Sequence, residues 1–314
     1  MKCCFIDEMT QFYSCGFSLG FGLYNAETGE KLSFTKTPYK NIDNISNLAD
    51  SNLIALSREG KNDVQVWDRC KNSHFLSFCI DPKENIKAIK IRPDVIFIIT
   101  LGTVYAYSLY NQNKILFFPT NKNTSAFDIS PSYSSYLMAV PLENVGSFAF
   151  YNYLEAEYPI SIVQAFKKPL KNLKFSRDGR FLAASSHDGN KIKIYKVPTG
   201  ELQATLNLSV TELRTHKIGY IAFNEYGNQL FAQTETNNIY LFDLPVFDIL
   251  SETESQTNIK PSCTFSPSKK QFWTCFGSEL YKMIVITSNN KIIYLNYNKK
   301  AKCLEKEKEI HFDV

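Results

Sequence analysis

The residues of this sequence that most clearly point to a chemical function are basic. Between Ala165 and Lys217 there are eleven lysines and arginines against four acidic residues, so this segment carries 11 − 4 = +7. The whole chain carries +4, which leaves −3 for the rest. Such a segment attracts anionic surfaces, such as a lipid membrane or nucleic acid. The alternative is a solvated rim whose lysines keep strand edges from pairing.

The aromatic residues of this segment argue against nucleic acid as the partner. Phe175, Phe181 and Tyr195 lie in predicted strands and are typical of core residues, not of an exposed stacking series. Recognition of single-stranded RNA needs exposed aromatic rings on which bases can stack. We therefore expect no nucleic-acid partner.

The sequence does not favour an enzyme. Its histidines form no metal-binding or triad arrangement, its eight cysteines form no C-x-x-C pair, and no glycine loop of the G-x-x-x-x-G-K type is present. We expect no catalytic residue, no metal ion and no cofactor. The N-terminus lacks the apolar run of a signal peptide, so we expect a cytoplasmic protein with free thiols.

The elements that position the basic segment are short strands. Residues 170–206 contain four strand patterns, separated by turn signals at 176–179, 187–189 and 198–200. Four antiparallel strands in about 40 residues are typical of one blade of a WD-repeat propeller.

An apolar-x-apolar-aromatic strand marks each copy of this unit. Its marker residues follow one another at steps of 43, 40, 43, 45, 47 and 53 residues: Tyr24, Trp67, Tyr107, Phe150, Tyr195, Phe242 and Leu295. This spacing predicts an all-β fold, a seven-bladed β-propeller of the WD-repeat type, with residues 1–314 as a single domain. The alternative is an unrelated array of β-sandwiches. The longest step predicts an inserted loop at about 245–261, between the last two strands of blade 6.

Blade 5 resembles a known family. The runs LKFSRDGRFLAASS (173–186) and GNKIKIY (189–195), followed by Thr199-Gly200-Glu201-Leu202, are similar to blade 5 of the PROPPINs, the phosphoinositide-binding propellers of autophagy and endosomal traffic. Residues 15–25, 64–68, 86–92 and 218–244 resemble the first, second, third and sixth blades in the same order. The resemblance implies a propeller that docks on membranes carrying phosphatidylinositol 3-phosphate or the 3,5-bisphosphate.

The family's lipid-reading arginines are missing here. In the family, a Phe-Arg-Arg-Gly motif follows blade 5, and each arginine serves one lipid pocket. The aligned residues are Leu206 to Ser209, so Asn207 and Leu208 stand at the arginine positions. Neither side chain makes the forked, charge-assisted contact with phosphate that arginine makes. A family histidine aligns with Phe166 and a further arginine with Lys193.

Basic residues near the same rim are candidates for a diffuse substitute site. They are Lys191, Lys193, Arg214, His216 and Lys217. Each basic residue near an anionic surface contributes about 1 kcal/mol, which predicts weak and salt-sensitive adhesion. The alternative is that these are ordinary loop charges.

The resemblance also implies a second membrane element in the inserted loop. The candidates for insertion into the bilayer are Val246, Phe247, Ile249 and Leu250. The alternative is that these residues pack at the edge of the blade and that the polar residues 251–260 form the true loop.

Together these observations predict a PROPPIN-like scaffold at autophagic or endosomal membranes, with weak or degenerate phosphoinositide binding. We expect it to be cytoplasmic, peripherally associated with phagophore or endosomal membranes, and to bind autophagy proteins such as a lipid-transfer partner. The alternative is a soluble WD-repeat interaction scaffold without lipid binding.

Overall fold

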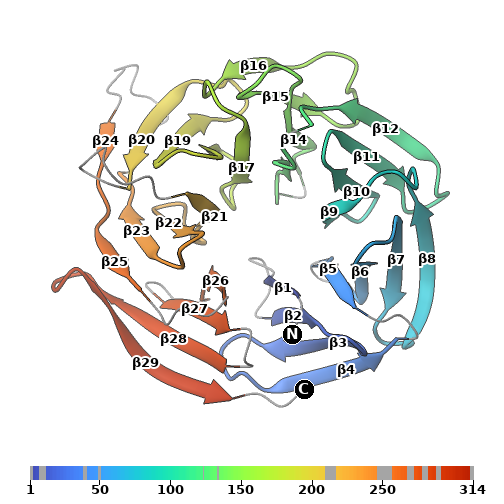
Figure 1. Ribbon diagram of the computed structural model, residues 1–314, viewed down its shortest axis with the longest axis horizontal. Coiled ribbons are helices and arrows are strands. Elements are labelled where there is room, and N and C mark those ends of the chain that lie inside the picture. The colour runs from blue at the N-terminus through green and yellow to red at the C-terminus, as the bar shows by residue number, and fades with distance from the viewer. Residues whose placement is uncertain are drawn as a thin grey trace. The chain divides into compact units, whose positions relative to one another are not determined.

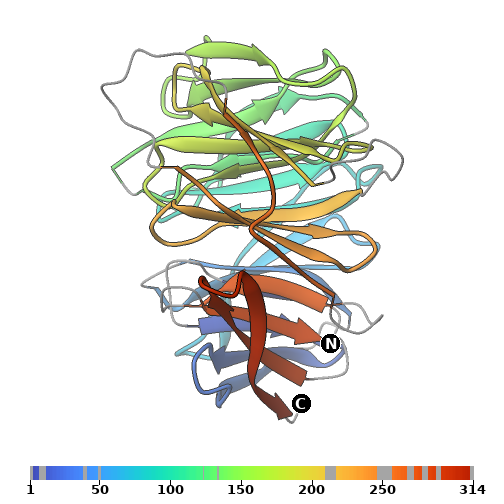
Figure 2. The same ribbon diagram turned by 90° about the vertical axis from the view of Figure 1, so that its left-hand side faces the viewer.

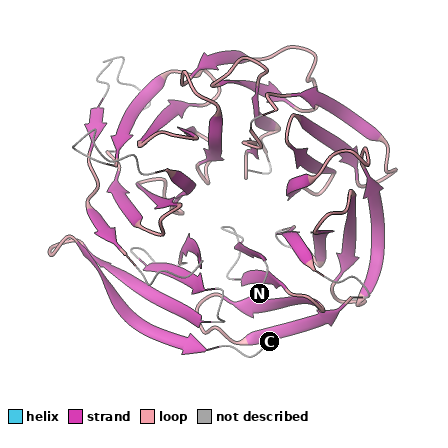
Figure 3. Cartoon of the chain, in the orientation of Figure 1, coloured by secondary structure: helices cyan, strands magenta, loops and turns pink. Residues whose placement is uncertain are grey.

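The fold is known from a computed structural model of the 314-residue chain. The structure describes residues 3–6, 12–37, 41–48, 51–122, 124–132, 134–208, 217–245, 257–266, 272–277, 282–287 and 291–311. All regular structure in these ranges is β-strand (Figure 3). Accordingly, this part of the chain contains no helix with the length and apolar character needed to cross a bilayer.

The chain divides into two compact units. Unit 1 comprises residues 1–119, 271–295 and 306–314 and contains three blades and most of a fourth. Blade 1 is β1 (Cys3–Ile6), β2 (Phe12–Gly16), β3 (Gly20–Asn25) and β4 (Lys31–Lys36). Blade 2 is β5 (Ile42–Asn47), β6 (Leu53–Arg58), β7 (Asp63–Asp68) and β8 (Ser73–Cys79). Blade 3 is β9 (Ile86–Ile91), β10 (Val95–Thr100), β11 (Thr103–Ser108) and β12 (Lys114–Pro119). Blade 7 is β26 (Phe272–Phe276), β27 (Lys282–Thr287), β28 (Lys291–Asn298) and β29 (Cys303–His311).

Unit 2 comprises residues 120–270 and 296–305 and contains blades 4 to 6. Blade 4 is β13 (Asp128–Ile129), β14 (Leu137–Pro141), β15 (Ser147–Asn152) and β16 (Ser161–Gln164). Blade 5 begins with β17 (Leu170–Phe175), β18 (Phe181–Ser186), β19 (Lys191–Lys196) and β20 (Leu202–Asn207). Blade 6 is β21 (Ile218–Phe223), β22 (Gln229–Thr234), β23 (Ile239–Asp243) and β25 (Cys263–Phe265). Figure 1 labels most of these strands.

The repeat found in the sequence is the third strand of each blade. The seven marker residues lie in β3, β7, β11, β15, β19, β23 and β28, so the sequence prediction of seven blades is confirmed. The apolar-x-apolar-aromatic pattern is clear in the sequence because both faces of the third strand are buried. In β7, for example, Val64, Gln65, Val66 and Trp67 are all buried.

Blade 5 has a fifth strand that the sequence pattern did not predict. Strand β24 (Thr257–Ile259) pairs in parallel with β20, and Ile259 lies beside Leu206 in the register. The chain then continues into β25, which pairs with β23 of blade 6. In Figure 2 this orange segment runs across the outer edges of both blades. The segment between β23 and β25 is therefore attached to blade 5 at its C-terminal end.

The Glu84 carboxylate links the connection between blades 2 and 3 to blade 3 by hydrogen bonds. Glu84 accepts hydrogen bonds from the hydroxyls of Thr100 (2.5 Å), Thr103 (3.2 Å) and Tyr105 (2.9 Å). All three donors are buried in blade 3. Burial raises the pKa of the Tyr105 hydroxyl, and the bond to Glu84 raises it further. The Glu84 carboxylate is thus the shared hydrogen-bond acceptor of three buried hydroxyls, and a buried hydroxyl that lacks an acceptor is costly.

Replacing Glu84 by alanine should lower the free energy of unfolding by about 2–3 kcal/mol, because it removes the shared acceptor from these hydroxyls. Glu84→Gln keeps one acceptor oxygen and should cost about half as much. Urea denaturation measures both. The neighbouring, exposed Lys83→Ala is the matched control, and an equal loss in that variant would contradict the role of the carboxylate.

Candidate functional site

The basic segment is divided between the two ends of blade 5. The antiparallel register brings the start of β17, the end of β18, the start of β19 and the end of β20 to one end of the sheet. We call this the lysine end; its lysines in blades 5 and 6 are Lys167, Lys168, Lys171, Lys191, Lys193, Lys217 and Lys260. Arg177, Arg180 and Lys196 lie at the opposite end of the same sheet. The local positive charge is therefore smaller than the charge of the sequence segment.

Two lysines at the lysine end share one carboxylate. Asp188, in the turn between β18 and β19, lies 3.4 Å from the Lys168 ammonium and 3.8 Å from that of Lys217. All three side chains are at least half exposed, at 50–59%. Exposed ion pairs contribute only about 0–1 kcal/mol, so both ammonium groups can turn toward an anionic ligand. Lys171 is paired in the same way with Glu235, at 3.3 Å.

Lys193 is bound internally. Its ammonium donates a 2.8 Å hydrogen bond to the Ala165 carbonyl and lies 5.1 Å from the centre of the Phe166 ring. Burial lowers the pKa of Lys193, and the charge of nearby Lys191 lowers it further. The structure thus brings together the two positions equated with a family histidine and arginine. At these positions the Lys193 ammonium lies over the Phe166 ring.

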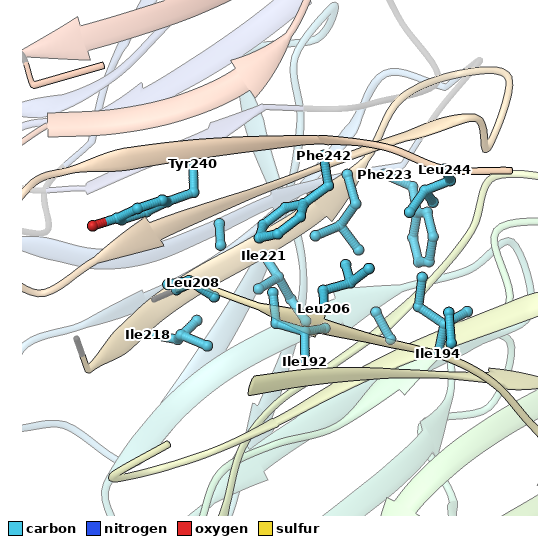
Figure 4. Packing of buried hydrophobic residues seen from close by; sticks show 14 of the residues in the cluster. Ile192, Ile194, Leu206, Leu208, Ile218, Ile221, Phe223, Tyr240, Phe242 and Leu244 are labelled. Carbon is cyan, nitrogen blue, oxygen red and sulfur yellow. The ribbon is translucent and has the colours of Figure 1, made fainter. Parts of the chain in front are cut away.

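The two arginine positions lie on opposite faces of blade 5. Asn207 pairs with Lys191 in the register, on the face where Lys193 contacts Phe166. Its side-chain amide lies 3.4 Å from the Asn258 oxygen of β24. Leu208 is only 4% exposed and belongs to the core between blades 5 and 6. In Figure 4 it lies beside Ile218. One position thus faces a polar contact and the other is filled by core packing.

The remaining predicted residues are placed as follows. Lys191 is exposed at the start of β19, and Lys217 is exposed directly before β21. Arg214, His216, Val246, Phe247, Ile249 and Leu250 lie outside the described residues. Sequence reasoning did not select Lys168 or Lys260. Lys168 stands in the basic segment directly before β17, which is a signal visible in the sequence. Lys260 lies next to Asn207 only because β24 pairs in parallel with β20, which the sequence does not show.

This arrangement places ammonium groups where they can attract phosphate groups. The ammonium groups near the surface are held by exposed ion pairs on separate turns. In the described residues, no group of three or more His, Cys, Asp or Glu side chains could hold a metal ion. The chemistry at the lysine end is therefore that of a positively charged surface.

Arginine at the two positions should affect stability unequally. Leu208→Arg buries a charge in the core between blades 5 and 6 and should lower the free energy of unfolding by about 3 kcal/mol. Asn207→Arg places the charge at the half-exposed rim and should change it by less than about 1 kcal/mol. Chemical denaturation of both variants tests this. Similar losses in the two would show that the faces are not distinguished as described.

The chain is similar in sequence to curated autophagy-related proteins. No family model matches it. It is 22% identical to autophagy-related protein 18 of Emericella nidulans over 262 residues, which cover 76% of this chain and 59% of that protein. It is 27% identical to autophagy-related protein 21 of Pichia angusta over 146 residues, 45% of this chain and 35% of that protein. The chain therefore spans less than two thirds of the length of these curated relatives.

Solved structures show the same fold. Hsv2 of Kluyveromyces lactis superposes with a TM-score of 0.82 at 15% identity, covering 99% of both chains. KlAtg21, in a complex with the coiled coil of AgAtg16, gives a TM-score of 0.79 at 13% identity and covers 99% of both chains. These comparisons confirm the all-β, seven-bladed β-propeller fold and the resemblance to the PROPPIN proteins, to which this chain is similar.

Proposed function

We propose that this chain is a PROPPIN-like scaffold that acts at autophagic or endosomal membranes and binds phosphoinositides weakly, through charge. The relatives named autophagy-related proteins 18 and 21 support the autophagy role. In this proposal the chain is cytoplasmic and associates peripherally with phagophore or endosomal membranes. Its surfaces assemble other proteins and carry no catalytic site.

The observation that carries the proposal is the lysine end of blades 5 and 6. Seven lysines gather there against the carboxylates of Asp188 and Glu235. The positions where the family keeps its arginines hold Asn207 and Leu208, and the Leu208 side chain is buried. A surface of this kind attracts anionic lipid without fixing the orientation of a headgroup. Adhesion should then follow the membrane's charge more than the position of its phosphates.

The segment between β23 and β25 is the second part of the proposal. Its C-terminal end is held on blade 5 by β24, with Ile259 packed against the core of blades 5 and 6. This anchor ends the segment close to the exposed Lys260, whereas the segment begins after Leu244, at the opposite end of blade 6. We propose that Val246, Phe247, Ile249 and Leu250, in the first half of this segment, enter the bilayer interface as an apolar loop.

Protein partners complete the scaffold. In a solved complex, KlAtg21 binds the coiled coil of AgAtg16. For this chain we propose an autophagy protein as the partner, such as a lipid-transfer protein. Propeller surfaces suit such contacts because function resides in the exposed turns and faces and not in the fold itself.

Vesicle flotation tests the membrane role. The triple variant Lys168→Ala, Lys191→Ala, Lys217→Ala should bind anionic vesicles roughly a hundredfold more weakly, because each basic residue contributes about 1 kcal/mol. At equal surface charge, vesicles with phosphatidylinositol 3-phosphate and vesicles with phosphatidylserine should bind wild type within about twofold of each other. Binding should fall steeply as salt is raised.

The matched control is the pair Arg180→Ala and Lys196→Ala, which removes basic residues from the opposite end of blade 5. This pair should leave flotation unchanged. An absence of binding to every anionic vesicle would remove the membrane role and favour the soluble scaffold. A strong preference for phosphatidylinositol 3-phosphate at equal charge would show that a stereospecific site exists despite the missing arginines.

A further inference from the structure

A second exposed surface of unit 2 lies on the connection between β15 and β16 of blade 4. Four large apolar side chains are exposed within nine residues: Leu154 (58%), Tyr158 (73%), Ile160 (49%) and Ile162 (63%). We call these four residues the blade 4 patch. Soluble proteins rarely gather exposed apolar side chains in this way unless the surface binds something.

The blade 4 patch is held on an ordered turn. Tyr153 is 3% exposed, and its ring packs at 5.5 Å against that of Tyr136. The Leu154 amide donates to the Asn152 side chain at 3.1 Å, and the Ile160 amide donates to the Phe150 carbonyl at 2.7 Å. A surface that is already fixed loses less conformational entropy when it binds a partner.

Two carboxylates are interleaved with these apolar residues. Glu155 and Glu157 are both exposed, and neither forms an ion pair with any residue that the structure describes. The patch is therefore apolar and negatively charged. It would be repelled by an anionic membrane surface, whereas positively charged residues flanking apolar ones would complement it.

The edge of blade 4 adds a place for an extended segment. Strand β16 is the last strand of its sheet, so its outer edge has no partner strand among those described. Ile162 lies within β16, and Ile160 directly precedes this strand. A segment added along such an edge pairs its backbone and presents alternate side chains to the patch.

We propose that the blade 4 patch binds an extended segment of a partner protein in which lysine or arginine alternates with aliphatic residues. The aliphatic side chains cover Tyr158, Ile160 and Ile162, and the basic side chains pair with Glu155 and Glu157. The inference deepens the scaffold proposal by naming a partner class, and it rests on that proposal but not on lipid binding.

The position of the patch is compatible with simultaneous membrane contact. Strand β16 begins at Ser161, next to the patch, and ends at Gln164, close to Phe166 and Lys193. The patch and the lysine end therefore lie at opposite ends of the strands of unit 2. A partner bound at one end leaves the other end accessible.

Fluorescence polarisation with a labelled decapeptide of alternating lysine and valine tests the proposal on the full chain. Wild type should bind this peptide at least tenfold more tightly than a lysine–serine peptide of equal charge, because only the former covers the apolar residues. The variants Glu155→Lys/Glu157→Lys and Tyr158→Ser/Ile162→Ser should each weaken binding about tenfold.

Matched single substitutions control for surface charge and exposed tyrosine elsewhere. Glu143→Lys reverses an exposed carboxylate at the opposite end of blade 4, and Tyr110→Ser removes a tyrosine that is 82% exposed in blade 3. Both should bind as wild type does. Circular dichroism melting of each variant separates lost binding from lost folding.

Several results would overturn the proposal. These are no binding of the lysine–valine peptide, equal binding of both peptides, or equal weakening by Glu143→Lys. A dimer seen by sedimentation that is lost in Tyr158→Ser/Ile162→Ser would make a second copy of the chain the occupant. Vesicle flotation that depends on Tyr158 would show that the blade 4 patch binds a membrane. If the vesicle experiments with the lysine variants fail, the peptide result still stands by itself.

Discussion

The packing of blade 5 on both faces is the constraint on which the candidate site depends. Ile192, Ile194 and Leu206 face the core shared with blade 6, while Tyr195 faces the core shared with blade 4. Because successive residues of a strand point to opposite faces, the alternation continues to the end of β20. Asn207 therefore joins Lys191 on one face and Leu208 joins Ile218 on the other. The two positions that the resemblance equates with the family's arginines therefore differ: one lies at a polar rim and the other in the core.

This difference agrees with the exposed placement of the described lysines at the lysine end. Leu208 fills the space beside Ile218, and Lys193 is bound to the Ala165 carbonyl and the Phe166 ring. The cations that remain accessible sit on turns, where exposed pairs with Asp188 hold them weakly. Long-range attraction needs only the net charge of such a surface, whereas recognition of one phosphate position needs fixed donors. The described lysines supply such a net charge.

The sequence predicted the parts of the fold that repeat. Strand β18 has the bounds expected from residues 181–186, and Gly179 has the positive φ of 72° that its turn requires. It did not predict β24, because Thr257-Asn258-Ile259 has no strand pattern of its own and becomes a strand only against the edge of β20. Likewise, Lys168, Asp188 and Lys217 are far apart in the chain. Only the arrangement of the blades brings their charges together.

The two ends of unit 2 differ in charge because different turns supply their residues. Connections that lead into β17 and β21 carry lysines, whereas the connection between β15 and β16 carries Glu155 and Glu157 among apolar residues. Turn residues do not have to pack in the core, so they can vary without cost to the fold. A rigid stack of strands then keeps the two surfaces apart at a fixed separation. In the function proposed above, this separation would let a partner bind at the blade 4 patch without neutralising the lysines at the lysine end.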